Sequence, residues 1–428
     1  MKIKPSKKKK NIVKWALIVI ASYYVITILY FGHGDIDSKT GISTFYWSGL
    51  DDLGRKDKAS GFLVNEYYPT FLNGVDGPYI FQNRSYSVSA DNKWLEKKVD
   101  TTDFIVVETG IREFPRFSLQ LRRNYPVEEF DYKMPEKLLA ISDIEGNLTG
   151  FYSLLVASKV IDPRGNWIFE KGALVLNGDF FDRGNQVTQL LWFIYHLENQ
   201  AAQKGGKVHF ILGNHEIMNL TGNASYNDFK YIEAAKRISS QSDWNKAILY
   251  MYSETSELGK WLRSKNIVER IGRNLFVHGG LNKFHLQEKF SIEEMNTIAR
   301  NHVAKELLSG TVTDKREELI TSSINSPYWD RRLNLDWKIR WIYRLKGIDA
   351  NKTSAKDLNQ ILKFYGAERI IIGHSVVNDI STGYNNQVVK IDVKHGEELN
   401  SGSTKGLLIQ NGGYYRIDDM GDRKLLFN

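Results

Sequence analysis

Residues 173–184 read ALVLNGDFFDRG, an apolar run followed at once by a glycine and a group of charged side chains. A short, continuous apolar run bounded by turn residues is typical of a strand that is buried on both faces. Asp179, Asp182 and Arg183 follow directly after this run. The stretch therefore predicts a buried strand that presents polar chemistry at its carboxyl end.

Four further blocks have the same arrangement. Each lies at the end of an apolar run: SDIEGN at 142–147, GNHE at 213–216, VHGG at 277–280 and GH at 373–374. Helical patterns at 148–160 and 185–203 separate the earliest of these runs, which predicts an α/β fold with parallel strands. Ligands of such sheets gather beyond the carboxyl ends of the strands. We therefore expect the five blocks to converge on one site.

The rest of the chain after residue 136 fits the same fold. Two longer helical insertions are expected at 225–265 and 288–365. Strand patterns return near the end of the chain, at 388–391 and 407–409.

The side chains in the five blocks are those that bind divalent cations. Asp143 and Glu145 are one residue apart and can reach one ion if Gly146 lets the backbone turn. Asp179 has two carboxylate oxygens, enough to bridge two ions. One amide and two imidazoles complete the set: Asn214, His278 and His374. Taken singly, such an aspartate is more often a helix N-cap and such a histidine a core or surface group. The joint pattern predicts a pair of metal ions, and the imidazoles favour Zn, Fe, Mn or Ni over Mg or Ca.

The blocks at 178–184, 213–216 and 278–281 resemble those of the calcineurin-like metallophosphoesterase superfamily. They are closest to its phosphoprotein-phosphatase branch, which includes the Shewanella-like phosphatases, and the resemblance spans residues 136–395. It implies a metallophosphoesterase-type α/β fold, a four-layer αββα sandwich of two mixed sheets. By position, Asp143 and Glu145 would bind the first metal and Asp179 would bridge. The second metal would be bound by Asn214, His278 and His374.

The resemblance also assigns catalytic roles. His215 would be the general acid that protonates the leaving group, and Asp182 would orient it. Arg183 would hold the phosphate with its planar guanidinium, which suits bidentate recognition.

One position departs from the family pattern. The first block of the family reads Asp-x-His, and this chain has Glu145 in place of the histidine. A second carboxylate can still bind a metal, but it adds negative charge and favours harder ions. We therefore expect two divalent ions (Mn, Fe or Zn) with Mn favoured. The alternative is that Glu145 marks a weakened or inactive enzyme.

A further segment, SPYWDRR at 326–332, is similar to the Ser-Pro-x-Trp segment of some bacterial-type members. Arg331 or Arg332 would then supply a second guanidinium to the substrate phosphate. The alternative is a solvated charge pair at a helix end.

Residues 12–31 predict a transmembrane helix, because twenty residues at about 1.5 Å each cross roughly 30 Å of hydrocarbon. They carry one charge, Lys14, and aromatic residues near both ends. Lysines on the N-terminal side predict a single-pass membrane protein with a cytoplasmic N-terminus and an extracytoplasmic catalytic domain, periplasmic in a bacterium. The alternative is a cleaved signal peptide, which the length of the run and its exit, LYFGH at 29–33, disfavour.

The expected organisation is a basic tail (1–11), the membrane helix (12–31), a loosely structured stalk (32–60), a β-rich accessory region (61–135) and the catalytic domain (136–428). Seven of the 58 basic residues lie in the first 32 residues, which contain no acidic residue. The remaining 51 basic residues nearly balance the 50 acidic ones, so we expect no nucleic-acid partner. The chain has no cysteine and therefore no disulfide or thiolate metal site.

Together these features predict a membrane-anchored phosphoesterase that cleaves a phosphate ester, expected to be a monoester, with a metal-activated water. The competing hypothesis is an envelope protein with the same fold that is catalytically weak or inactive and acts as a binding or scaffold module.

Overall fold

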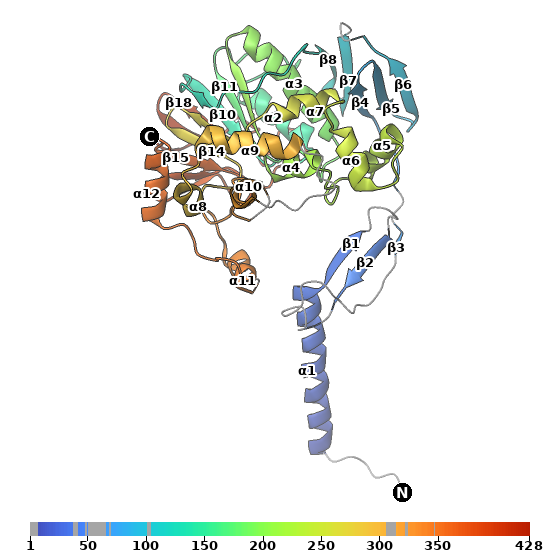
Figure 1. Ribbon diagram of the computed structural model, residues 1–428, viewed down its shortest axis with the longest axis vertical. Coiled ribbons are helices and arrows are strands. Elements are labelled where there is room, and N and C mark those ends of the chain that lie inside the picture. Colours follow the sequence, from blue (N-terminus) through green and yellow to red (C-terminus); the bar gives the residue numbers. More distant parts are fainter. Residues whose placement is uncertain are drawn as a thin grey trace. The chain divides into compact units, whose positions relative to one another are not determined.

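The computed structural model describes residues 7–36, 42–47, 49, 66–67, 70–100, 104–304, 314–321, 324–345 and 347–428. They form two compact units, Met1–Pro69 with Trp341–Asp349, and Thr70–Arg340 with Ala350–Asn428 (Figure 1). Every predicted site residue lies in the second unit.

Two six-stranded mixed sheets form the centre of the second unit. The first has the order β12-β11-β10-β18-β19-β20. Its strands are β10 (Lys137–Ile141), β11 (Ala173–Asn177), β12 (Lys207–Ile211), β18 (Lys405–Gln410), β19 (Gly413–Asp418) and β20 (Arg423–Phe427). β10, β11 and β12 run parallel, and β18 joins β10 antiparallel. The parallel strands are therefore those predicted from the continuous apolar runs.

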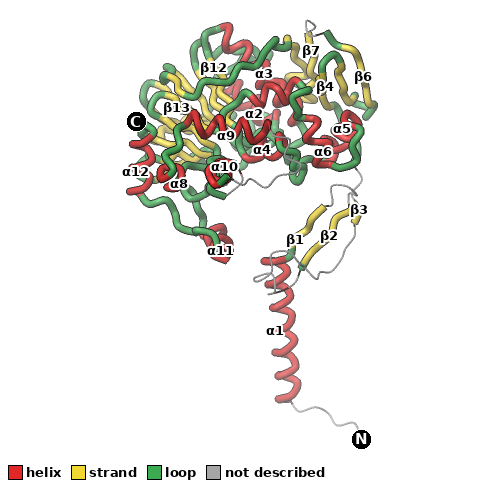
Figure 2. Tube along the Cα trace, in the orientation of Figure 1, coloured by secondary structure: helices red, strands yellow, loops and turns green. Residues whose placement is uncertain are grey.

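The second sheet has the order β16-β17-β15-β14-β13-β9. Its strands are β9 (Asp131–Tyr132), β13 (Val268–Ile271), β14 (Asn274–Val277), β15 (Arg369–Ile372), β16 (Ser381–Gly383) and β17 (Val388–Lys390). β14, β15 and β17 are parallel neighbours. The sheets approach each other at β12 and β13, where the backbone N–H of Leu212 donates to Asn266 O at 2.8 Å (Figure 2).

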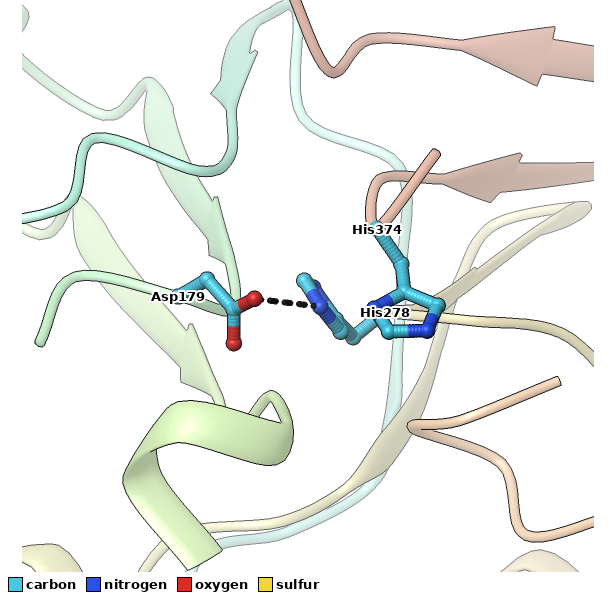
Figure 3. Close-up of side chains that lie close together, drawn as sticks. All are labelled: Asp179, His278 and His374. Carbon is cyan, nitrogen blue, oxygen red and sulfur yellow. Dashed lines mark ion pairs between the residues drawn. The ribbon is translucent and has the colours of Figure 1, made fainter. Parts of the chain in front are cut away.

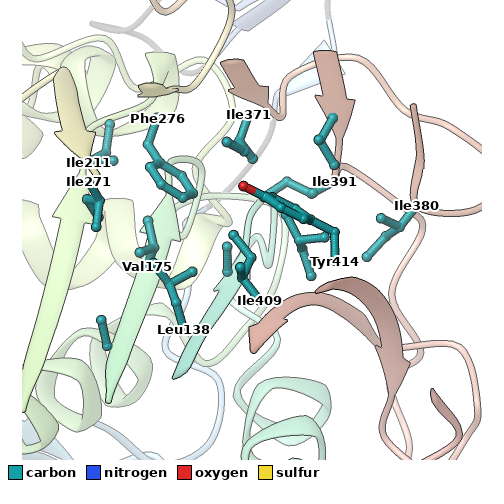
Figure 4. Close-up of a cluster of buried hydrophobic side chains, with 14 of the residues drawn as sticks. Leu138, Val175, Ile211, Ile271, Phe276, Ile371, Ile380, Ile391, Ile409 and Tyr414 are labelled. Carbon is teal, nitrogen blue, oxygen red and sulfur yellow. The ribbon is translucent and has the colours of Figure 1, made fainter. Parts of the chain in front are cut away.

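The core lies between the two sheets (Figure 4). Leu138 and Val175 of the first sheet and Phe276 and Ile371 of the second belong to one cluster, and all four are fully buried. Burial of such side chains contributes about 1.5–3 kcal/mol each. The packing fixes the two sheets together and so fixes the loops at their carboxyl ends.

Helices surround the sheets. Their bounds are α2 (Leu148–Ala157), α3 (Val187–Gln203), α4 (Asn214–Leu220), α5 (Phe229–Ser239), α6 (Trp244–Met251), α7 (Glu257–Arg263), α8 (Lys283–Gln287), α9 (Ile292–Ala304), α10 (Lys315–Thr321), α11 (Trp337–Leu345) and α12 (Ala355–Phe364). α3 packs on β12 and α9 packs on β13, so helices lie against both sheets. Helices also occupy the two predicted insertions. The expected α/β fold with two mixed sheets is confirmed.

Short strands occupy the predicted β-rich region. A three-stranded sheet contains β4 (Asp76–Phe81), β5 (Arg84–Val88) and β6 (Trp94–Lys98), and a hairpin contains β7 (Phe104–Ile111) and β8 (Phe114–Gln120). β4, β7 and β8 pack on α3, where Trp192 Nε1 donates to Pro78 O at 2.7 Å. β9, from the same region, pairs with β13 and forms one edge of the second sheet. Residues 70–135 therefore belong to the same compact unit as the catalytic core.

The first unit contains α1 (Lys7–Phe31), β1 (His33–Ile36), β2 (Ile42–Tyr46) and β3 (Glu66–Tyr67). The window Lys14–Phe31 is long and apolar enough to cross a membrane, a property that a signal sequence would share. β1 and β2 pair antiparallel inside the region expected to be a loose stalk, so that expectation differs from the structure at these residues. Residues 50–65, also predicted as stalk and accessory region, lie outside the described residues.

Candidate metal centre and active site

The five sequence blocks lie at the carboxyl ends of five strands. β10 leads to Asp143, β11 to Asp179 and β12 to Asn214, and these strands are parallel neighbours. In the second sheet the parallel strands β14 and β15 lead to His278 and His374. Because the parallel strands of each sheet end at the same edge, the sheet topology brings the blocks together.

Asp179, His278 and His374 form the centre of the site (Figure 3). One ligand atom from each lies within 4.8 Å of the others, and all three residues are buried. Nε2 of His278 is 3.0 Å from Asp179 Oδ2 and 3.1 Å from Asn214 Oδ1. Four of the six predicted metal ligands therefore share one small volume.

The orientation of the two imidazoles suits metal binding. Nδ1 of His278 donates to the carbonyl oxygen of Asn177 at 2.9 Å, which directs Nε2 towards Asp179 and Asn214. A second hydrogen bond of this kind commonly fixes the ring of a ligating histidine. Nε2 of His374 is buried and has no hydrogen-bond partner among the described residues. A buried imidazole nitrogen without a partner is unusual and fits a ring that belongs to a binding site.

The first block contacts this centre through Asp143 and contacts Arg183 through Glu145. Asp143 Oδ2 accepts a hydrogen bond from the backbone N–H of His374 at 3.1 Å, which ties the first block to the fifth. The carboxylate of Glu145 forms an ion pair with Arg183. The ligand atoms of Asp143 and Glu145 lie outside the close group of Asp179, His278 and His374.

Charges around the centre favour a cation. Burial alone would lower the pKa of His278, but Asp179 and Asp143 outweigh it and raise that pKa to about 10. Burial, with Asp179 adding to it and His278 opposing it, raises the pKa of Asp143 to about 7. The same carboxylates that raise the pKa of His278 also attract a metal cation, which would neutralise them in place of the proton.

His215 and Asp182 form a buried pair beside this centre. Nδ1 of His215 donates to Asp182 Oδ2 at 2.7 Å, and Nε2 lies 3.8 Å from Asp179 Oδ2. Asn219 and Asn227 both donate to Asp182 Oδ1, at 3.0 and 2.7 Å. Burial alone would lower the pKa of His215, but Asp179 and Asp182 outweigh it and raise that pKa to about 9.

The backbone of the site is unusual. Six predicted site residues have φ between 49° and 68°: Asp143, Glu145, Asp179, Asp182, Arg183 and His374. Non-glycine residues rarely adopt this left-handed conformation, and a cluster of such residues is typical of functional sites. Gly178, with φ of 87°, precedes Asp179, and a Cβ there would lie 2.5 Å from Nδ1 of His278. The close approach of the two blocks therefore requires glycine at 178.

The two candidate substrate arginines occupy different environments. Arg331 contacts the carbonyl oxygen of His374 and donates to Ser375 Oγ at 3.1 Å, so it lies beside the site. Arg332 is buried and pairs with Asp330 at 3.1 Å and with Asn325 Oδ1 at 2.7 Å. The prediction that Arg332 binds substrate is wrong, because its guanidinium holds together the loop that presents Arg331. The alternative of a solvated charge pair is also wrong for Arg332.

Two further groups support the site and were missed from the sequence. Glu216 is fully buried, and its carboxylate accepts the backbone N–H groups of Gly213, Asp179 and Phe180 at 2.7–2.9 Å. It therefore fixes the loop that carries Asp179. In the sequence, its place in the GNHE block was the feature that could have indicated this role. Nε2 of His395 lies 2.8 Å from the carbonyl oxygen of Ser142. The spacing of His395 along the chain gave no indication of a role in the site.

A cavity of about 700 Å³ opens beside this centre. Its lining includes Asp143, Glu145, Arg183, Asp392 and His395. Burial, and then Asp143, raise the pKa of Asp392 well above its ordinary value. The cavity therefore exposes Arg183 together with two of the predicted metal ligands, Asp143 and Glu145.

Comparison with known proteins agrees with the resemblance inferred from the blocks. Residues 136–378 match the family of calcineurin-like phosphoesterases. Shewanella-like protein phosphatase 1 of Plasmodium berghei (strain Anka) is 29% identical over 247 residues, which cover 56% of this chain and 61% of that relative. Shewanella-like protein phosphatase 2 of Arabidopsis thaliana is 24% identical over 329 residues, covering 67% of this chain and 78% of the relative.

A solved structure gives the same result. The cold-active protein-tyrosine phosphatase of a psychrophilic Shewanella species superposes with a TM-score of 0.69 and 27% identity, covering 83% of this chain and 100% of that one. The predicted family is confirmed. The chain belongs to the calcineurin-like phosphoesterases, a family of phosphate-ester hydrolases.

Proposed function

We propose that this protein is a membrane-anchored phosphatase that hydrolyses phosphomonoesters with a pair of divalent metal ions. One observation carries the proposal: the close group Asp179, His278 and His374 lies next to the buried pair His215–Asp182, 3.8 Å from Asp179. A cation site and a proton donor are therefore adjacent, as ester hydrolysis requires.

The predicted ligands fit a metal pair. Nε2 of His278 lies 3.0 Å from Asp179 and 3.1 Å from Asn214, and Asp143 accepts a hydrogen bond from the backbone of His374. Imidazole, amide and carboxylate donors together suit Mn, Fe or Zn, and the extra carboxylate of Glu145 favours Mn. When bound, such a pair supplies Lewis acidity that activates a water and neutralises charge on the phosphate.

The chain's own residues complete the reaction. Nε2 of His215 is the proton donor to the leaving oxygen, because Asp182 occupies its Nδ1 at 2.7 Å. Asn219 and Asn227 hold Asp182 in place and keep the ring oriented. Arg183 lines the cavity and binds the phosphate oxygens with its guanidinium. Arg331, fixed against His374 O, presents a second positive charge to the same side.

The printed names of the relatives suggest which substrates to test first. Two are called protein phosphatases and the Shewanella structure is called a protein-tyrosine phosphatase. The chain spans 61% of the length of the Plasmodium relative, so the substrate is proposed here only as a class. Phosphotyrosine and phosphoserine peptides belong in one panel with sugar and lipid phosphates.

The test uses the full-length protein in detergent. Metal analysis of the purified protein is combined with an assay of p-nitrophenyl phosphate and the peptide panel, before and after chelation. We expect bound transition ions, hydrolysis that chelation abolishes, and recovery on adding Mn²⁺. Turnover that survives complete removal of metal would contradict the proposal.

The ion pair of Glu145 with Arg183 specifically favours the second hypothesis, a weak or inactive member of the family. This ion pair engages the guanidinium of Arg183, the group that should bind phosphate. Under this hypothesis the protein binds metal yet hydrolyses none of the panel, and phosphorylated ligands bind without turnover.

We further propose that α1 anchors the protein, with the N-terminus in the cytoplasm and the catalytic unit on the other side of the membrane. Support comes from the apolar window Lys14–Phe31 and from the lysines that precede it. Protease added to intact cells or spheroplasts should digest residues 70–428 and spare an N-terminal tag. Recovery of a shortened, freely soluble protein would show a cleaved signal peptide instead.

A further inference from the structure

Helix α11 (Trp337–Leu345) presents a stripe of large apolar side chains. Trp337, Trp341 and Leu345 are spaced by four residues and therefore share one face of the helix. They are 76%, 44% and 39% exposed, and the neighbouring Ile342 is 43% exposed. Tyr343, which points in a different direction, is buried. One side of the helix packs on the protein, and an apolar side is left uncovered, which marks an interaction surface.

The charges on α11 indicate what this surface binds. Lys338 and Arg344 flank the stripe, and the helix contains no acidic residue. Tryptophan and leucine on one face with basic residues beside it are typical of helices that lie in the interface of a lipid bilayer. Long basic side chains can bury their stems and keep their charges among the headgroups.

A contact within the first unit places this surface beside the predicted membrane anchor. The ring of Trp341 packs against the ring of Tyr30, with centroids 5.0 Å apart. Tyr30 lies at the end of the apolar window Lys14–Phe31, where the chain leaves the predicted span. Tyrosine and tryptophan concentrate at this depth of a bilayer. The contact therefore sets Trp341 at the level of the lipid headgroups.

We propose that α11 is a second membrane contact, which lies flat on the bilayer surface with Trp337, Trp341 and Leu345 inserted among the lipids. This inference rests on the proposed anchoring by α1.

The test uses the absence of cysteine in this chain. L345C is made in the full-length protein, labelled with an environment-sensitive fluorophore and reconstituted into nanodiscs of phosphatidylcholine and phosphatidylglycerol. Nitroxide attached at a shallow acyl position serves as the quencher. Two single-cysteine variants provide matched controls: L29C on α1, where the side chain is 76% exposed, and V106C on β7, where it is 45% exposed.

We expect the labels at 345 and 29 to lose fluorescence and the label at 106 to keep it. Adding W337Q and W341Q to L345C should abolish quenching at 345 without changing the circular dichroism. Quenching at 29 but not at 345 would overturn the inference and leave the anchoring intact. No quenching at 29 would refute the anchoring and the inference together. A label at 345 that responds to protein concentration but not to nitroxide would show a protein partner or a second copy instead, and would also overturn it.

Discussion

Nδ1 of His215 lies 2.7 Å from Oδ2 of Asp182, and both side chains are buried. Because Asp182 also accepts hydrogen bonds from Asn219 and Asn227, its position is fixed on both oxygens. The imidazole can therefore present only Nε2 to the neighbouring centre, where Asp179 lies 3.8 Å away. This arrangement suits a proton donor to a leaving group, and it leads to the first prediction.

H215N should retain bound metal and lose about 10²- to 10⁴-fold in kcat, the usual contribution of a general acid. The loss should be larger for alkyl phosphates than for p-nitrophenyl phosphate, whose leaving group needs little protonation. Steady-state kinetics on both substrates, with metal analysis, checks this. H196N is the matched control, because His196 bonds Gln200 away from the site at 2.9 Å. Full activity of H215N on an alkyl phosphate would refute the assignment.

R183K should raise KM or lower kcat/KM by about 10- to 100-fold, because lysine keeps the charge but cannot form a bidentate contact worth about 1.5–3 kcal/mol. Inorganic phosphate should inhibit the variant correspondingly less. R112K, on an exposed turn where Arg112 pairs with Glu113 at 3.1 Å, provides the control. If R183K and R112K behave alike, Arg183 does not hold the phosphate.

E145H should separate the two hypotheses about this site. The substitution releases Arg183 from its ion pair and supplies the imidazole of the Asp-x-His pattern. We expect higher phosphatase activity and a preference that moves from Mn towards Zn or Fe. E145Q removes the charge without adding an imidazole. It should release Arg183 from the ion pair and leave the metal preference without the contribution of an imidazole. Lower activity in E145H than in the parent would show that Glu145 is itself a required ligand.

His285 should make the stability of the protein sensitive to acid. Burial lowers its pKa from 6.5 to about 4, and its Nδ1 accepts the backbone N–H of Asn282 at 3.1 Å. Above pH 6.5 both folded and unfolded states are neutral here, and as the pH falls towards 4 only the unfolded state takes up the proton. A shift of this size costs at most about 3 kcal/mol of unfolding free energy. Urea titrations at several pH values should show this loss in the parent and a smaller one in H285N, whereas equal slopes would contradict it.

Much of the fold could be predicted from local patterns. The runs at 138–141, 173–176 and 370–372 are continuous and apolar because their strands are buried on both faces, and each ends where its polar block begins. The topology of parallel strands then brings the blocks together. Local sequence could not show which of Arg331 and Arg332 lies beside the site. The difference arises in the folded chain, where the guanidinium of Arg332 is held by Asp330 and Asn325.

Other features depend on distant partners in the same way. Glu216 looked like one more polar residue of its block, and only the folded chain shows that it fixes the Asp179 loop. The pairing of β9 with β13 joins residues about 140 positions apart, so no local period could indicate it. The ion pair of Glu145 with Arg183 was likewise invisible, although both residues were singled out from the sequence.

The most direct measurement is the metal content of the full-length protein and of its D179N variant, by mass spectrometry on samples purified in parallel with anomalous diffraction to locate the ions. We predict two transition ions in the parent, flanking Asp179, and loss of both metal and turnover in D179N. A parent that binds no transition ion, or a D179N protein that keeps a full complement at the same positions, would contradict the account.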